Sequence, residues 1–76
     1  MIKTSKDEVI RAIARGVIVE GDIYHTTCGA FVITELTTNP YGRSAIIGMS
    51  AEIDEETGIV GEPTNITAID LIGAEF

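Results

Sequence analysis

The chain opens with the apolar spacing of a helix and continues with the patterning of β-strands. After Ser5, apolar residues recur at the spacing of one helix face, at Val9, Ile10, Ile13 and Val17. Ser5 and Glu8 form a capping-box sequence, in which each side chain satisfies a free amide at the helix start. Gly16 stands where a residue of left-handed conformation commonly follows a helix. The pattern therefore predicts a helix over residues 5–15.

The rest of the chain has the features of strands joined by short turns. The predicted strands are residues 17–20, 23–27, 30–38, 44–54, 59–62 and 66–72. Gly21-Asp22 suits a two-residue hairpin between the first two, although one long strand with a bulge at Gly21 also fits. Pro63 is expected to stop the short strand 59–62 and to make it an edge strand. Four glycines are expected to mark bends or bulges, at Gly29, Gly48, Gly61 and Gly73.

One helix followed by about five strands predicts an α+β domain. We expect an antiparallel meander over residues 17–76, curled or barrel-like, with the helix packed across one face. The whole chain, residues 1–76, is expected to form a single domain. Strands do not alternate with further helices, so the pattern excludes a Rossmann-type cofactor fold.

The composition favours self-association. A chain of 76 residues buries only about 60% of the surface that its unfolded form exposes. Hydrophobic residues make up 45% of the chain and the mean hydropathy is +0.27, which is more apolar material than so small an interior can hide. The single Cys cannot form an intrachain disulfide, and one Cys with one His cannot complete a closed zinc site without carboxylates or residues of other subunits. We therefore predict a homo-oligomer with no metal and no cofactor.

The charge restricts the partners. The formal net charge is −7 and the isoelectric point is about 4.3, whereas nucleic acids and anionic membranes require a basic face. No apolar stretch approaches the roughly 18–20 residues of a membrane span, and no secretion signal is recognised. The sequence therefore predicts a cytoplasmic protein that binds neither nucleic acid nor membrane.

One candidate site surrounds Arg43, the only Lys or Arg after residue 15. Residues 39–42 read Asn-Pro-Tyr-Gly, which favours a turn with a glycine bulge and places Arg43 at the start of the next strand. An anion or nucleotide could bind there, with an aromatic ring for stacking and a guanidinium for phosphate. The hypothetical ligand-binding residues are Thr37, Thr38, Asn39, Tyr41 and Arg43. The alternative is a surface arginine that pairs with some of the many carboxylates.

A second candidate site is an acidic turn. Its hypothetical partner-docking residues are Glu52, Asp54, Glu55 and Glu56. Paired carboxylates perform acid–base chemistry only in a cleft that raises one pKa, and a turn in a small domain rarely provides one. The cluster is therefore interpreted either as a solvated turn or as a docking patch for a basic partner.

The only His and the only Cys lie close together in the sequence. His25 and Cys28 would point to opposite faces of an extended strand, and no orienting group or oxyanion hole is evident. Cys28 is expected to be a small buried residue near a turn and His25 an exposed or hydrogen-bonded strand residue. No catalytic residues are assigned.

The sequence predicts a small acidic protein that is not an enzyme. We expect it to act as a homo-oligomer on a macromolecular partner, as an inhibitor or accessory subunit. The alternative is an oligomeric protein that sequesters a small anionic ligand, such as a nucleotide, between subunits near Tyr41 and Arg43. A capped helix followed by a β meander is common among small bacterial and phage-encoded proteins, which is a statement about architecture alone.

Overall fold

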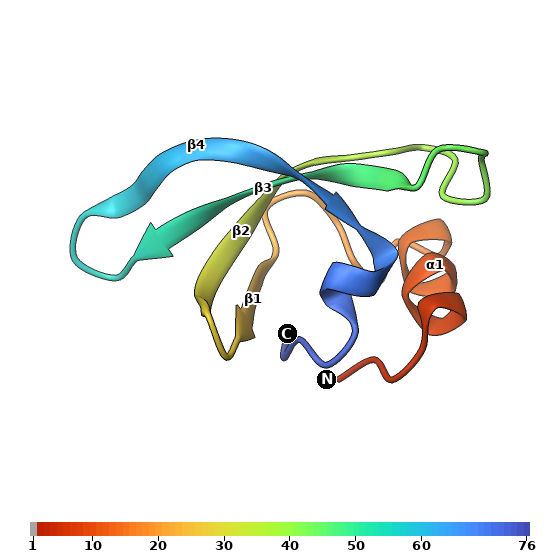
Figure 1. The fold of residues 1–76 in the computed structure, drawn as a ribbon, viewed down its shortest axis with the longest axis horizontal. Helices are drawn as coiled ribbons and strands as arrows, with labels where there is room; N and C mark the ends of the chain where they lie inside the picture. The colour runs from red at the N-terminus through yellow and green to blue at the C-terminus, as the bar shows by residue number, and fades with distance from the viewer. Residues whose placement is uncertain (1) are drawn as a thin grey trace.

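The computed structural model describes residues 2–76 and has an α+β architecture (Figure 1). Its elements are helix α1 (Lys6–Ala14), strands β1 (Ile23–Thr26), β2 (Gly29–Leu36), β3 (Ile46–Asp54) and β4 (Gly58–Thr67), and the 3₁₀ helix η1 (Ala68–Leu71). The strands form one antiparallel sheet in the order β1-β2-β3-β4. The prediction of an α+β meander is confirmed. The sheet has four strands and is open, so the expected fifth strand and barrel-like closure are not found.

Helix α1 begins and ends at the residues that the sequence indicated. The Ser5 hydroxyl accepts a hydrogen bond from the Glu8 amide at 3.2 Å. The Glu8 carboxylate accepts from the Thr4 amide at 3.3 Å, and not from the Ser5 amide of a standard capping box. At the other end Gly16 has a φ of 74°. The amides of Gly16 and Val17 donate to the carbonyls of Ile13 and Ala12, which is a Schellman motif.

The core lies between the sheet and the two helices. Its buried residues are Val9, Ala12, Ile13, Ile18, Tyr24, Ile33, Ile47, Ile66, Ala68, Leu71 and Ala74. The prediction for Val17 was wrong, because this residue is half exposed and Ile18 is buried in its place. The left-handed turn at Gly16 redirects the chain, so the helical spacing no longer applies beyond it.

Residues 17–20 do not form a strand, contrary to the prediction. The amides of Val17 and Ile18 both donate to the Ala12 carbonyl of α1. The Val19 amide donates to the Asp22 carboxylate at 3.0 Å. These amides are used by the helix end and by a local turn, so they are not available to a β-ladder. The tight hairpin joins β1 to β2 instead, through residues 27–28.

The last predicted strands were also divided in the wrong place. Strand β4 continues through Pro63, which lies between the pairs Val60↔Glu52 and Thr64↔Ser50, where the register shifts. A residue without an amide hydrogen is tolerated in such a bulge, and β4 is an edge strand as predicted. Residues 66–67 end β4, and beyond Thr67 the chain turns into η1, so the predicted strand 66–72 does not form as such.

The two ends of the described chain lie side by side (Figure 1). Glu75 forms a bridge to Ile2 and another to His25 on the free edge of β1. The Gly73 amide donates to the Lys3 carbonyl at 2.8 Å. The edge of β1 is therefore partly covered, whereas β4 ends the sheet on the other side.

The β3–β4 hairpin extends past the helical layer, and we call its residues 52–62 the acidic arm (Figure 1). The molecule measures 35 × 21 × 18 Å along its principal axes. Within residues 2–76, no helix has the length and apolar character needed to cross a membrane.

Candidate functional site

The loop that carries the predicted ligand site is longer than expected. Residues 37–45 join β2 to β3, so Arg43 lies within the loop and does not start a strand. The Gly42 amide donates to the Asn39 carbonyl at 3.1 Å, which confirms the turn. Gly42 is not among the glycines with positive φ, so the expected glycine bulge is absent there. The Asn39 side chain accepts from the Tyr41 amide at 3.2 Å and shapes the loop.

The loop lies against the start of helix α1. Thr37 lines a cavity of about 400 Å³ together with residues of β2, β3 and β4. Tyr41 and Arg43 line a separate cavity of about 370 Å³. Lys6 and Asp7 of α1 also line the second cavity. The structure thus brings Tyr41 and Arg43 together and separates Thr37 from them. Lys6 was missed because its proximity depends on helix packing and not on sequence spacing.

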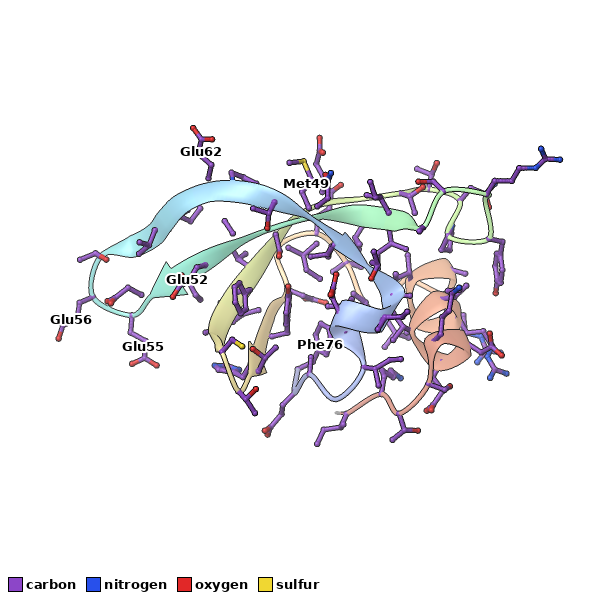
Figure 2. All side chains as sticks on the ribbon, in the orientation of Figure 1. Met49, Glu52, Glu55, Glu56, Glu62 and Phe76 are labelled. Atoms are coloured by element: carbon purple, nitrogen blue, oxygen red, sulfur yellow. The ribbon has the colours of Figure 1, made fainter. Side chains whose placement is uncertain are left out.

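The four acidic docking residues are all exposed on the acidic arm. Figure 2 shows Glu55 and Glu56 at its tip. The Asp54 carboxylate accepts from the Glu56 amide at 2.8 Å and so shapes the turn. Figure 2 places Glu62 on the sheet face that points away from α1. Glu62 was not among the predicted residues, because the position of the β4 bulge could not be foreseen.

The acidic arm also exposes apolar side chains and an unpaired strand edge. Ile59 is 60% exposed and Val60 is 47% exposed. In the described sheet β4 pairs with β3 alone, so its outer edge has free amide and carbonyl groups. The arm therefore combines charge, apolar surface and backbone hydrogen-bonding capacity.

His25 and Cys28 form no site with each other. His25 is an exposed residue of β1 whose backbone bonds to Glu75, as the sequence analysis expected. Cys28 is exposed in the β1–β2 turn, so the prediction of a buried thiol was wrong. The hairpin at residues 27–28 places it outside the sheet. Within residues 2–76, no group of three or more His, Cys, Asp or Glu residues could hold a metal ion.

An aromatic and hydroxyl-lined groove, which the sequence analysis missed, lies on the helix-facing side of the sheet. Its volume is about 350 Å³, and its lining includes Tyr24, Phe31, Ser50, Thr64, Asn65 and Asp70. We call it the Tyr24 groove. The Tyr24 hydroxyl and the Ser50 hydroxyl share a hydrogen bond of 2.8 Å at its base. The Phe31 ring stacks on Tyr24 with ring centres 5.4 Å apart.

The electrostatics of this groove are governed by burial and by one nearby carboxylate. Burial raises the pKa of Tyr24 above its usual value, and the hydrogen bond between Tyr24 and Ser50 partly offsets this increase. The negative charge of Asp70 also raises the pKa of Tyr24, as the smallest of the three contributions. Asp70 accepts from the Thr67 amide at 2.7 Å, which fixes its position at the start of η1.

Comparison with protein-family models, with curated proteins and with solved structures finds no match for this chain.

Proposed function

We propose that this chain is a small acidic, non-catalytic binding protein that acts in the cytoplasm, as a homo-oligomer, on a macromolecular partner. The observation that carries the proposal is the acidic arm, which presents an unpaired strand edge beside two exposed apolar residues, Ile59 and Val60. Edge strands of this kind bind extended segments of other proteins by adding a strand to the sheet. An inhibitor or an accessory subunit fits this mode of action.

Charge favours a basic protein segment as the partner. Residues 52–62 contain five carboxylates, from Glu52, Asp54, Glu55, Glu56 and Glu62, and no Lys, Arg or His. Complementary charge accelerates association and suppresses wrong partners. Two copies of the same arm would repel each other, which argues against pairing between two β4 edges. The partner at this edge is therefore a different chain with a basic, extended segment.

Self-association uses a different surface in this proposal, namely the sheet face that points away from α1. By register and strand alternation, Ile23, Val32 and Ala51 share one row of this face, and His25, Ala30, Ile53 and Ile59 share the next. The first row is uncharged and lies outside the acidic arm. Two acidic protomers can approach most readily across such a neutral, apolar strip. A second copy is the proposed occupant.

The arm is tested with a capped heptapeptide of alternating valine and lysine, titrated into ¹⁵N-labelled protein. We expect the amide signals of residues 58–65 to shift, and the affinity to fall as salt is raised. The matched control is the same peptide with alternate amides N-methylated, which keeps charge and shape but cannot complete the ladder. It should bind at least about tenfold more weakly.

Equal binding of the two peptides, or shifts confined to other surfaces, would remove strand addition from the proposal. Ile59→Thr retains a β-branched residue on the arm while deleting apolar surface, so it should weaken the peptide without unfolding the sheet. Unchanged affinity in this variant would exclude a role for the apolar part of the arm.

Self-association is tested by native mass spectrometry and light scattering of Ile23→Glu. Ile23 is 46% exposed on the uncharged strip of this face, and a charge there should raise the dissociation constant of the oligomer at least about tenfold. The control is Ile69→Glu, because Ile69 is 66% exposed on η1 and lies outside that face. A wild-type monomer, or equal effects of the two variants, would refute the proposed interface.

A second candidate function is sequestration of a small anion, such as a nucleotide. It is favoured by the cavity that Lys6, Tyr41 and Arg43 line together, since Lys6 adds a second cation to the predicted site. Tyr41 is 66% exposed and free to stack on a base. The test is calorimetry with adenosine monophosphate. Arg43→Ala should abolish binding and leave the thermal midpoint of the free protein unchanged, and equal binding by this variant would eliminate the candidate.

A further inference from the structure

The Tyr24 groove lies beside the acidic arm and opens on the helix-facing side of the sheet. Strand β4 contributes Thr64, Asn65 and Ile66 to its lining, directly after the bulge that ends the arm. We infer that this groove binds the cationic end of a lysine or arginine side chain supplied by the partner. The inference rests on the proposed function, because it names the anchoring contact of the same basic partner.

The aromatic lining of the groove can attract a cation. The Phe31 ring is partly exposed, whereas Tyr24 beneath it is only 3% exposed. The two rings are nearly parallel, with an interplanar angle of 22°, so Phe31 is held flat against a buried support. Phe76 lies on another side of Tyr24, with ring centres 5.6 Å apart. A rigid, partly exposed ring face of this kind attracts a cation through its quadrupole.

Two carboxylates, Asp70 and Glu52, make the groove and its surroundings negative. Asp70 lines the groove, and its charge reaches the Tyr24 ring. Glu52 is the register partner of Phe31, so both side chains lie on the same sheet face. A Glu52 carboxylate oxygen lies 3.7 Å from the position that a Cβ on Gly29 would occupy, which places this charge over β2. No Lys, Arg or His lines the groove within the described chain.

The remaining lining is suited to an extended alkyl cation and unsuited to an anion. Thr64, the register partner of Ser50, offers a hydroxyl oxygen, and Ile66 offers apolar surface for a methylene stem. A volume of about 350 Å³ lies at the lower end of the roughly 300–1,000 Å³ typical of small-ligand pockets. If the partner's strand docks along β4, its lysine or arginine side chain needs to cross only β4 to reach the groove.

The test uses the intact protein and three small probes followed by ¹⁵N and aromatic ¹³C chemical shifts. The probes are arginine, lysine and citrulline, each capped as the N-acetyl N-methylamide. We expect arginine and lysine to shift the Phe31 ring and the amides of Ser50 and Asn65. Citrulline has nearly the shape of arginine without its charge, and it should bind at least about fivefold more weakly. Equal binding of citrulline would overturn the inference.

Two variants locate the site. Phe31→Leu keeps an apolar residue but removes the ring face, and Asp70→Asn keeps an oxygen acceptor for the Thr67 amide but removes the charge. Each should weaken the arginine probe about two- to fivefold. The control Glu35→Gln removes the same charge from an exposed position of β2 that does not line the groove, and it should leave the affinity unchanged. If Glu35→Gln weakens binding as much as Asp70→Asn, the probe senses only the general acidic field and the inference fails.

The source of the cation is decided by comparing the capped arginine with a capped heptapeptide of alternating valine and arginine. A partner side chain requires the peptide to bind at least about tenfold more tightly, because the strand then adds its own contacts. Peptide affinity no greater than that of capped arginine would overturn the assignment to a protein side chain. Strand addition can fail in the N-methylation test while capped arginine still binds, so the two proposals are separable.

Discussion

Replacing Tyr24 with phenylalanine isolates the buried hydroxyl pair at the base of the groove. Tyr24 and Ser50 are each 3% exposed, and their oxygens are 2.8 Å apart. Among the described residues, no buried side-chain nitrogen or oxygen lacks a hydrogen-bond partner. Tyr24→Phe keeps both ring contacts and removes only this oxygen. The Ser50 hydroxyl is then left without its partner.

The expected loss of stability is about 1 kcal/mol. An unsatisfied buried polar group costs about 1–3 kcal/mol, and the lower value applies because the pair borders an open groove from which water can enter. In a domain of this size about 1 kcal/mol lowers the thermal midpoint by about 4–8 °C. Ser50→Ala should cost a similar amount, since it leaves the Tyr24 hydroxyl unpaired. The double variant should cost no more than either single one, because it leaves no buried hydroxyl unpaired.

The assay is thermal and urea unfolding of the four proteins, followed by circular dichroism at one protein concentration, because self-association would otherwise shift the midpoints. Additive losses in the double variant would refute the pairing of the two hydroxyls. The pH dependence gives a second readout. Since burial raises the pKa of Tyr24, the unfolded chain loses this proton first, and stability falls as pH rises above the ordinary tyrosine value of about 10. Tyr24→Phe should lack this alkaline decline.

Two further predictions concern the frame that holds the sites. A Cβ on Gly48 would overlap the Glu35 carbonyl oxygen, so Gly48→Ala should lower the free energy of unfolding by about 1–3 kcal/mol. A Cβ on Gly42 would meet the Asn39 carbonyl oxygen at 3.2 Å, so the comparison variant Gly42→Ala should cost less than Gly48→Ala. Equal losses would contradict the close approach of β2 and β3. Hydrogen bonds from Thr4 and, to a lesser extent, from Ser5 lower the pKa of Glu8. The ionised Glu8 therefore stabilises the fold at pH values above the ordinary glutamate pKa, and this stabilisation is lost as the pH falls through the lowered pKa of the folded state. Glu8→Gln should therefore lose part of the acid sensitivity of unfolding, and an unchanged acid profile would refute the cap.

Local signals in the sequence predicted local structure well. The Ser5 cap, the apolar spacing up to Ile13 and the glycine at position 16 depend only on neighbouring residues, and helix α1 lies within one residue of its predicted bounds. The strand around Ile47–Ile53 was recognised for the same reason, but a register shift beside Ile47 puts this residue in the core and breaks the predicted alternation with Met49, Ala51 and Ile53. The α+β meander followed from these elements and from the turns between them.

The errors arose where backbone partners are distant or unexpected. Val17 and Ile18 have high β-propensity, but their amides bond to the end of the helix. Residues 68–71 read as a strand because they are apolar, yet the Asp70 carboxylate bonds back to the Thr67 amide and turns the chain into η1. A polar side chain that bonds the nearby backbone competes with a ladder, and apolar content alone does not reveal this.

The candidate sites were predictable in part. The acidic turn was identified because its residues are adjacent in the sequence, and the structure places them on one exposed arm. The groove was not identified, because Tyr24, Phe31, Ser50 and Asp70 come from four different elements. Their proximity depends on strand register and on the docking of η1, neither of which a single sequence reports.

The pairing of Glu75 with both Ile2 and His25 has a consequence for how the chain is made. On the ribosome helix α1 emerges about sixty residues before Leu71 and Ala74, which complete the core around it. The meander can pair strand by strand as it appears, because its neighbours are consecutive. The helix remains partly uncovered until η1 and Ala74 arrive. Chaperone contacts during synthesis would therefore concentrate on α1, and release from them would coincide with the docking of η1.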